Sequence, residues 1–123
     1  MALTGALIAE SLHVGAALEG MSLTVVKISR ADVGDVDAGQ PLTWTFLEFE
    51  AADEDADRLA NGLERALEPV GGWYCDFRND DDTWVVFADR TFRYPRGDAR
   101  GRARTVEHAR SVGVPESQLD WPV

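Results

Sequence analysis

The sequence contains a single cysteine, Cys75, and only two histidines. One thiol cannot close an intramolecular disulfide, and no paired Cys or Cys/His spacing supplies the ligands of a structural zinc site, so a secreted disulfide scaffold is excluded. The motifs G-x-S-x-G, G-x-x-x-x-G-K-[ST], G-x-G-x-x-G and H-E-x-x-H do not occur either. We therefore expect no metal and no cofactor, and no residue is assigned a catalytic role.

Long apolar runs are missing as well. The first nine residues are mostly apolar, but Glu10 interrupts them and no basic residue precedes them, which is unlike a secretory signal peptide. No segment approaches the roughly 20 apolar residues that a helix needs to cross a bilayer. The sequence therefore predicts a cytoplasmic protein without a membrane segment.

Basic residues are a minority. The 123 residues include 12 Lys and Arg against 22 Asp and Glu, which gives a net charge of -10. Seven arginines lie between positions 90 and 110, where the local charge is +5, and the rest of the chain carries -15. Nucleic-acid affinity depends on neutralising phosphates, so this balance disfavours a nucleic-acid partner. Binding of duplex RNA through the arginine-rich segment remains a third alternative.

The alternation and spacing of apolar residues predict the elements along the chain. Thr4 is a suitable helix cap, and the spacing of Leu7, Ile8 and Leu12 predicts a short helix that ends near His13. Two strands, a long helix, three short strands and a last helix are predicted over residues 22–30, 42–50, 53–67, 73–78, 83–88, 91–94 and 98–113.

These elements predict one α+β domain over residues 1–123. Their order is α-β-β-α-β-β-β-α, and 45% hydrophobic residues suffice for a core. We expect an antiparallel sheet with the helices mainly on one face. The final residues are too apolar for a free terminus, so Leu119 and Trp121 are expected to dock on the core.

An acidic block surrounds the predicted start of the long helix. It comprises Glu48, Glu50, Asp53, Glu54, Asp55 and Asp57. Asp53 is a preferred N-cap residue, and carboxylates in a first turn are stabilised by the helix dipole. We interpret the block as the chemistry of a helix start, with a partner-binding surface as the alternative.

The second face of the three-stranded meander is the candidate binding surface. Its predicted binding residues are Tyr74, Asp76, Arg78, Phe87, Arg93 and Arg96. If the helices cover the opposite face, this mixture of aromatic and arginine side chains resembles the core of an interface. In the alternative arrangement the N-terminal helix covers Val85 and Phe87, and Asp76 pairs with Arg93 across the strands.

Two functions follow from this surface. The first is a non-enzymatic interaction protein, an adaptor, inhibitor or immunity-like protein, that binds another protein or a second copy of the chain. The alternative is a small enzyme or ligand-binding domain in which Tyr74 and Asp76 act as acid and base and the arginines hold a small anionic molecule. That alternative predicts a concave pocket beside Tyr74 and a perturbed Asp76.

Several segments carry a resemblance. They are Gly72-Trp73-Tyr74-Cys75-Asp76-Phe77, Phe92-Arg93-Tyr94, Gly113-Val114-Pro115-Glu116 and Gln118-Leu119-Asp120-Trp121. Over nearly its full length the chain resembles a group of small acidic proteins of actinomycete-type bacteria with no assigned activity. The resemblance implies a bacterial, cytoplasmic, single-domain protein and transfers no catalytic or binding residue. In size and charge alone the chain is also similar to immunity proteins and antitoxins.

Overall fold

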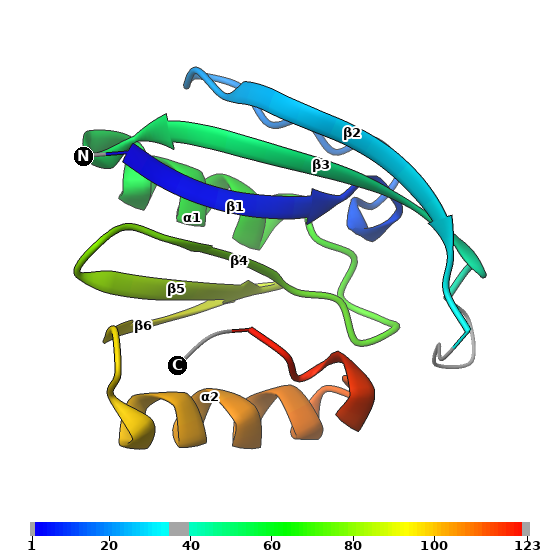
Figure 1. Cartoon of the computed structure of the whole chain (residues 1–123). Coiled ribbons are helices and arrows are strands. Elements are labelled where there is room, and N and C mark those ends of the chain that lie inside the picture. Colours follow the sequence, from blue (N-terminus) through cyan, green and yellow to red (C-terminus); the bar gives the residue numbers. More distant parts are fainter. Residues whose placement is uncertain (1, 35–39, 122–123) are drawn as a thin grey trace.

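One six-stranded antiparallel sheet forms the centre of the computed structural model, which describes residues 2–34 and 40–121 (Figure 1). The strand order is β2-β3-β1-β4-β5-β6. The α+β class and the antiparallel sheet are therefore confirmed. In chain order the elements are β1 (Ala2–Ile8), η1 (Ala9–Ser11), β2 (Thr24–Asp32), β3 (Thr43–Ala52), η2 (Asp53–Asp55), α1 (Ala56–Ala66), β4 (Cys75–Arg78), β5 (Asp82–Phe87), β6 (Arg90–Pro95), α2 (Ala99–Ser111) and η3 (Glu116–Gln118).

The predicted N-terminal helix is wrong, because this segment forms the strand β1. β1 pairs with β3 on one side and with β4 on the other, so its backbone gains two ladders that a short isolated helix cannot match. Leu3 and Leu7 are 0% and 4% exposed, and they alternate with residues on the other face. The order of strands and α-helices is thus β-β-β-α-β-β-β-α rather than one that begins with a helix.

Gly5 allows β1 to lie at the centre of the sheet. A Cβ atom at this position would lie 2.7 Å from Cβ of Phe77 and 2.8 Å from Cζ of Phe49. Only a residue without a side chain fits between these neighbours. Gly5, in the segment predicted to be a helix, was therefore a sign that this segment packs closely between other strands.

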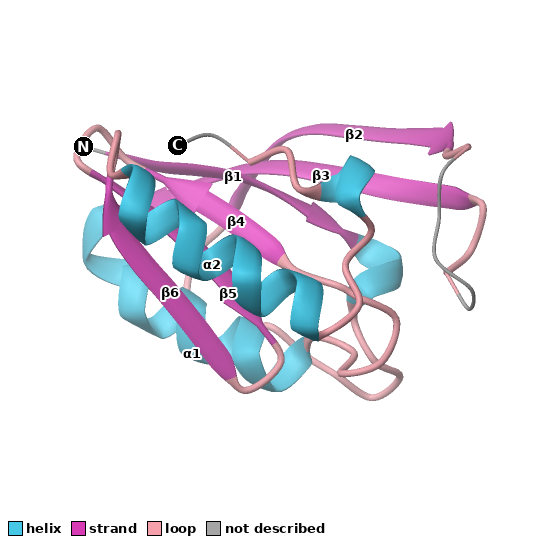
Figure 2. Ribbon diagram, turned by 90° about the horizontal axis from the view of Figure 1, so that it is seen from below, coloured by secondary structure: helices cyan, strands magenta, loops and turns pink. Residues whose placement is uncertain are grey.

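The two helices lie on opposite faces of the sheet, so the prediction that they share one face is wrong. In Figure 2, α2 lies in front of β5 and β6 and α1 lies behind them. β5 explains this arrangement: Trp84 and Val86 pack in the α1 core, whereas Val85 and Phe87 pack in the α2 core. A strand buried on both faces has a continuous apolar run, and residues 84–87 form one.

α1 covers its face with the predicted apolar stripe. Leu59 and Leu63 are each 1% exposed and pack in one cluster with residues of β1, β3, β4 and β5. The predicted cap residue Asp53 lies in η2, where its Oδ1 accepts a hydrogen bond from the side-chain amide of Asn79 at 3.0 Å. The helix itself begins three residues later, at Ala56.

α2 is capped and packed as the sequence predicts. Asp98 Oδ1 accepts a hydrogen bond from the backbone N–H of Arg100 at 3.1 Å. Gly101 allows close contact with β6, because a Cβ atom there would lie 2.5 Å from Cβ of Tyr94. Residues 112–121, the C-terminal segment, follow α2 and dock on this core. Leu119 and Trp121 pack in the α2 cluster, as predicted.

α2 covers only part of its face of the sheet. Its core cluster consists of residues from β5, β6, α2 and the C-terminal segment, with Tyr74 beside them. Figure 1 shows α2 beneath β5 and β6, away from β1, β2 and β3. The β1 and β3 residues on this face, such as Ala6 and Phe46, are therefore left without a helical cover.

Candidate functional site

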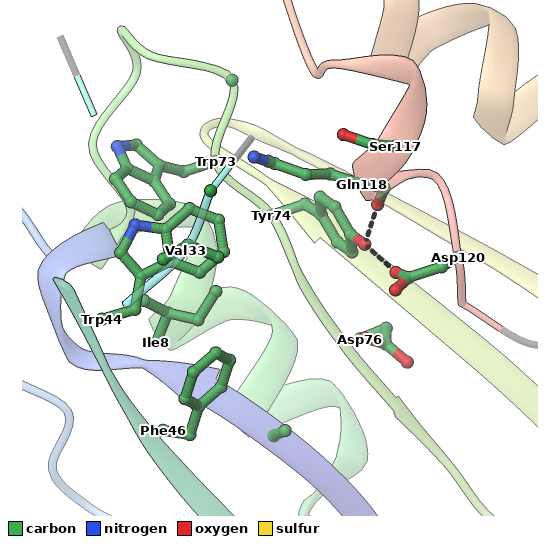
Figure 3. Close-up of a pocket in the computed structure, with 13 residues that line it drawn as sticks. Ile8, Val33, Trp44, Phe46, Trp73, Tyr74, Asp76, Ser117, Gln118 and Asp120 are labelled. Atoms are coloured by element: carbon green, nitrogen blue, oxygen red, sulfur yellow. Dashed lines mark hydrogen bonds between the residues drawn. The ribbon is translucent and has the colours of Figure 1, made fainter. Parts of the chain in front are cut away.

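A cavity of about 440 Å³ lies on the uncovered part of the sheet, next to the C-terminal segment. Its floor comes from β1, β3 and the chain around β4, and its rim comes from η3 and the residues that follow it (Figure 3). The lining residues are Ala6, Ile8, Val33, Gly34, Trp44, Phe46, Gly72, Trp73, Tyr74, Asp76, Ser117, Gln118 and Asp120.

Strand register brings the floor residues together. β1 pairs Ile8 with Phe46 of β3 and Ala6 with Asp76 of β4. Directly paired residues point to the same face of an antiparallel sheet. The apolar residues from β1 and β3 and the carboxylate from β4 therefore meet at one place, although they are far apart in the sequence.

Aromatic rings form one wall. The ring centroids of Trp44 and Trp73 are 5.3 Å apart, and those of Trp44 and Phe46 are 6.1 Å apart. The indole N–H of Trp44 donates to the carbonyl of Pro41 at 2.8 Å, which holds that ring in place. Tilted rings at these separations pack favourably, so the wall is rigid and largely apolar.

Polar groups form the opposite wall. The Tyr74 hydroxyl donates to the backbone carbonyl of Gln118, and Asp120 Oδ1 lies 3.2 Å from it as a second acceptor. Burial, with the nearby carboxylate of Asp120, raises the pKa of Tyr74 well above its ordinary value. Tyr74 therefore stays protonated at neutral pH and ties the C-terminal segment to the sheet.

Asp76 is the second carboxylate of this wall. Burial raises the pKa of Asp76 to about 6; Arg78 lowers it and Asp120 raises it. Among the described residues, no Lys, Arg or His forms an ion pair with Asp76. The sheet thus holds a partly desolvated carboxylate beside the cavity, and no described residue forms an ion pair with it.

The predicted arginine cluster does not form. Arg78 lines a neighbouring cavity of about 400 Å³ that shares Ala6 and Phe46 with the first. Arg93 lies on the α1 side, 2.7 Å from the Asp82 carboxylate and over the Trp84 ring. Arg96 donates to the backbone carbonyl of Asn79 at 3.3 Å.

The turn between β5 and β6 explains the error. Phe87 pairs with Arg90 and Val85 pairs with Phe92, so Arg93 falls on the opposite face from Val85 and Phe87. The pair of Asp76 and Arg93, which belonged to the alternative arrangement, does not form for the same reason, and because β5 separates their strands. Phe87 is 2% exposed and packs against His108 of α2, so it does not lie on an open face.

The sequence predicted Tyr74 and Asp76 in the pocket but missed most of the other lining residues. Ile8 was assigned to a helix, and Trp73 was placed on the covered face although β4 begins only at Cys75. The alternation of Trp44 and Phe46 around Thr45 was the available signal for two aromatic rings on one face of the strand. No local sequence pattern indicates that Gln118 and Asp120 line the cavity.

Comparisons of the chain with models of known protein families, with curated proteins and with solved structures found no match. In the described part of the chain, no helix is long and apolar enough to cross a membrane. Within the same residues, no group of three or more His, Cys, Asp and Glu side chains converges on a point that would hold a metal ion. The site consists of an aromatic wall and, opposite it, two carboxylates, Asp76 and Asp120.

Proposed function

We propose that this chain binds a small molecule in the cavity between β1, β3, β4 and the C-terminal segment. The observation that carries the proposal is the cavity itself, with a volume of about 440 Å³, mainly apolar and aromatic walls and a few polar groups at one side. Small-molecule sites typically have this size and this lining. The concave pocket beside Tyr74 and the perturbed Asp76 are the two features that the ligand-binding alternative predicted from the sequence.

The walls support binding because they are held in place without a ligand. Trp121 donates its indole N–H to the Tyr94 hydroxyl at 2.9 Å, which fixes the residues beside Gln118 and Asp120 to the core under α2. Arg102 donates to the backbone carbonyls of Leu119 and Trp121 at 2.9 and 3.3 Å. A preformed pocket loses little conformational entropy when it binds.

Binding without catalysis fits these residues best. Ser117 is the only hydroxyl nucleophile besides Tyr74 among the described lining residues, and neither histidine lines the cavity. A serine nucleophile needs an adjacent base to activate it. The anionic ligand that was expected from the arginines loses its support, because none of the described residues that line this cavity is an arginine.

A pocket-blocking variant tests the proposal. Ala6 is exposed on the cavity floor, so Ala6→Phe should fill the space and reduce fragment binding by about tenfold or more. Ala2→Phe is the matched control, since Ala2 is exposed on the same face of β1 but outside the cavity. We would screen a chemically diverse fragment library by NMR and follow the indole N–H signals of Trp44 and Trp73.

The expected result is a set of fragments that shift both indole signals in the wild type and in Ala2→Phe but not in Ala6→Phe. Trp84, which is buried on the α1 side, should not respond. The proposal fails if no fragment shifts the Trp44 and Trp73 signals, or if Ala6→Phe binds the same fragments with unchanged affinity.

Binding of a second copy of the chain is the second candidate function, and the edge strand β2 favours it. Val25, Val26 and Ile28 are 48%, 55% and 65% exposed, and β2 has a strand neighbour on one side only. Unpaired strand edges with apolar side chains pair readily with other strands. Sedimentation should show a dimer for the wild type and a monomer for Ile28→Lys; a wild type that stays monomeric at high concentration would rule this pairing out.

A further inference from the structure

The charge of the cavity lining is of one sign. Among the described lining residues the charged side chains are Asp76 and Asp120, and none is basic. Figure 3 shows both carboxylates on the Tyr74 side, opposite Ile8, Trp44 and Phe46. A ligand in this cavity therefore meets negative charge at one end and apolar surface at the other.

Among the described residues, no Lys, Arg or His side chain forms an ion pair with the carboxylate of Asp76. Its desolvation and the nearby negative charge of Asp120 both disfavour the ionised form, and Arg78 offsets them only in part. Adding a cation beside such a carboxylate improves its interactions more than it would at an exposed one, because the surrounding dielectric is lower. The cavity thus favours a ligand with a positive charge at this end.

The aromatic wall is compatible with the same charge. Indole and phenyl faces carry a negative potential and attract ammonium groups, best at Trp. Trp44, Phe46 and Trp73 form this wall of the cavity. An anionic ligand would meet repulsion from both walls, whereas a cation meets attraction from both.

We propose that the ligand is a small organic amine, protonated at neutral pH, with an aromatic or aliphatic body. Its ammonium group lies beside Asp76 and Asp120, and its apolar body packs on Ile8, Trp44 and Phe46. This inference rests on the proposed small-molecule function and adds the chemical class of the ligand. It reverses the sign of charge that the arginine residues suggested in the sequence.

Three probes that differ mainly in charge test the ligand class. Calorimetric titration with 2-phenylethylamine, 2-phenylethanol and phenylacetate should show binding of the amine, at least about tenfold weaker binding of the alcohol, and no binding of the carboxylate. Equal affinity for the amine and the alcohol would overturn the assigned charge while the pocket proposal stands. If none of the probes and no fragment from the library binds, the proposed function itself fails.

Charge-neutral variants locate the amine. Asp76→Asn and Asp120→Asn should each weaken the binding of 2-phenylethylamine by about tenfold and leave the affinity for 2-phenylethanol nearly unchanged. Asp80→Asn is the matched control, because it removes the same charge from the exposed turn between β4 and β5, outside the cavity. Loss of amine affinity in Asp80→Asn equal to that in Asp76→Asn would show long-range charge attraction alone and would contradict the assignment.

Discussion

Replacement of Trp121 with Ala is expected to lower the free energy of unfolding by about 3 to 5 kcal/mol. Trp121 is 3% exposed, and its ring meets Tyr74 edge-on with centroids 5.0 Å apart. Its indole N–H donates to the Tyr94 hydroxyl at 2.9 Å. The substitution removes a large buried ring and leaves the buried Tyr94 hydroxyl without this donor, and both effects destabilise the fold.

Urea denaturation followed by circular dichroism measures this loss. Trp121→Phe is the informative control, because it keeps an aromatic ring and removes the N–H donor, and it should cost much less than Trp121→Ala. Since Trp121 holds the C-terminal segment that carries Gln118 and Asp120, Trp121→Ala should also weaken fragment binding in the cavity. A loss of stability below about 1 kcal/mol would mean that this segment is not docked as described.

Replacement of Asp76 with Asn is expected to raise the free energy of unfolding at pH 7.5 by about 1 to 3 kcal/mol. Burial raises the pKa of Asp76 from 3.8 to about 6, so the ionised form is less favourable in the folded state than in the unfolded state. Asn has no charge to desolvate. A substitution that increases stability while it weakens ligand binding is typical of a functional site.

The pH dependence of this effect has a definite sign. Between about pH 4 and pH 6 the folded protein holds a proton on Asp76 that the unfolded chain has released, so this residue makes the wild type less stable as pH rises through that window. The advantage of Asp76→Asn should therefore grow from near zero at pH 4 and become constant above pH 7. Urea denaturation at several pH values measures it, with Asp80→Asn as control. A stability difference that is independent of pH, or that favours the wild type at pH 7.5, would contradict the assignment.

The sequence predicted the elements whose patterns are local. The apolar stripe of α1 reflects one buried face, so periodicity located this helix. β2 was located from its β-branched and apolar residues, although it is exposed along nearly its whole length. β1 was missed because Leu7, Ile8 and Leu12 fit a helical spacing as well, and only its pairing with two distant strands decides the outcome. Local propensity does not contain that long-range contribution.

The candidate site could be predicted only in part. Tyr74 and Asp76 belong to one segment of alternating residues, so their shared neighbourhood followed from the sequence. The cavity, however, also needs Ile8, Phe46 and Gln118, which come from three other segments. The sheet face on which each β6 side chain lies depends on the length of the turn between β5 and β6. A shift of one residue in this turn moves Arg93 to the other face of the sheet.

The most direct test of the central claim is an NMR experiment that detects proton contacts between isotope-labelled protein and unlabelled benzyltrimethylammonium. We predict contacts from the N-methyl protons of the probe to the ring protons of Tyr74, beside Asp76 and Asp120, and from its phenyl protons to the ring protons of Trp44 and Phe46 on the opposite wall. Contacts confined to the acidic turn at residues 80–82, or no contacts at all, would contradict a cavity that binds organic cations.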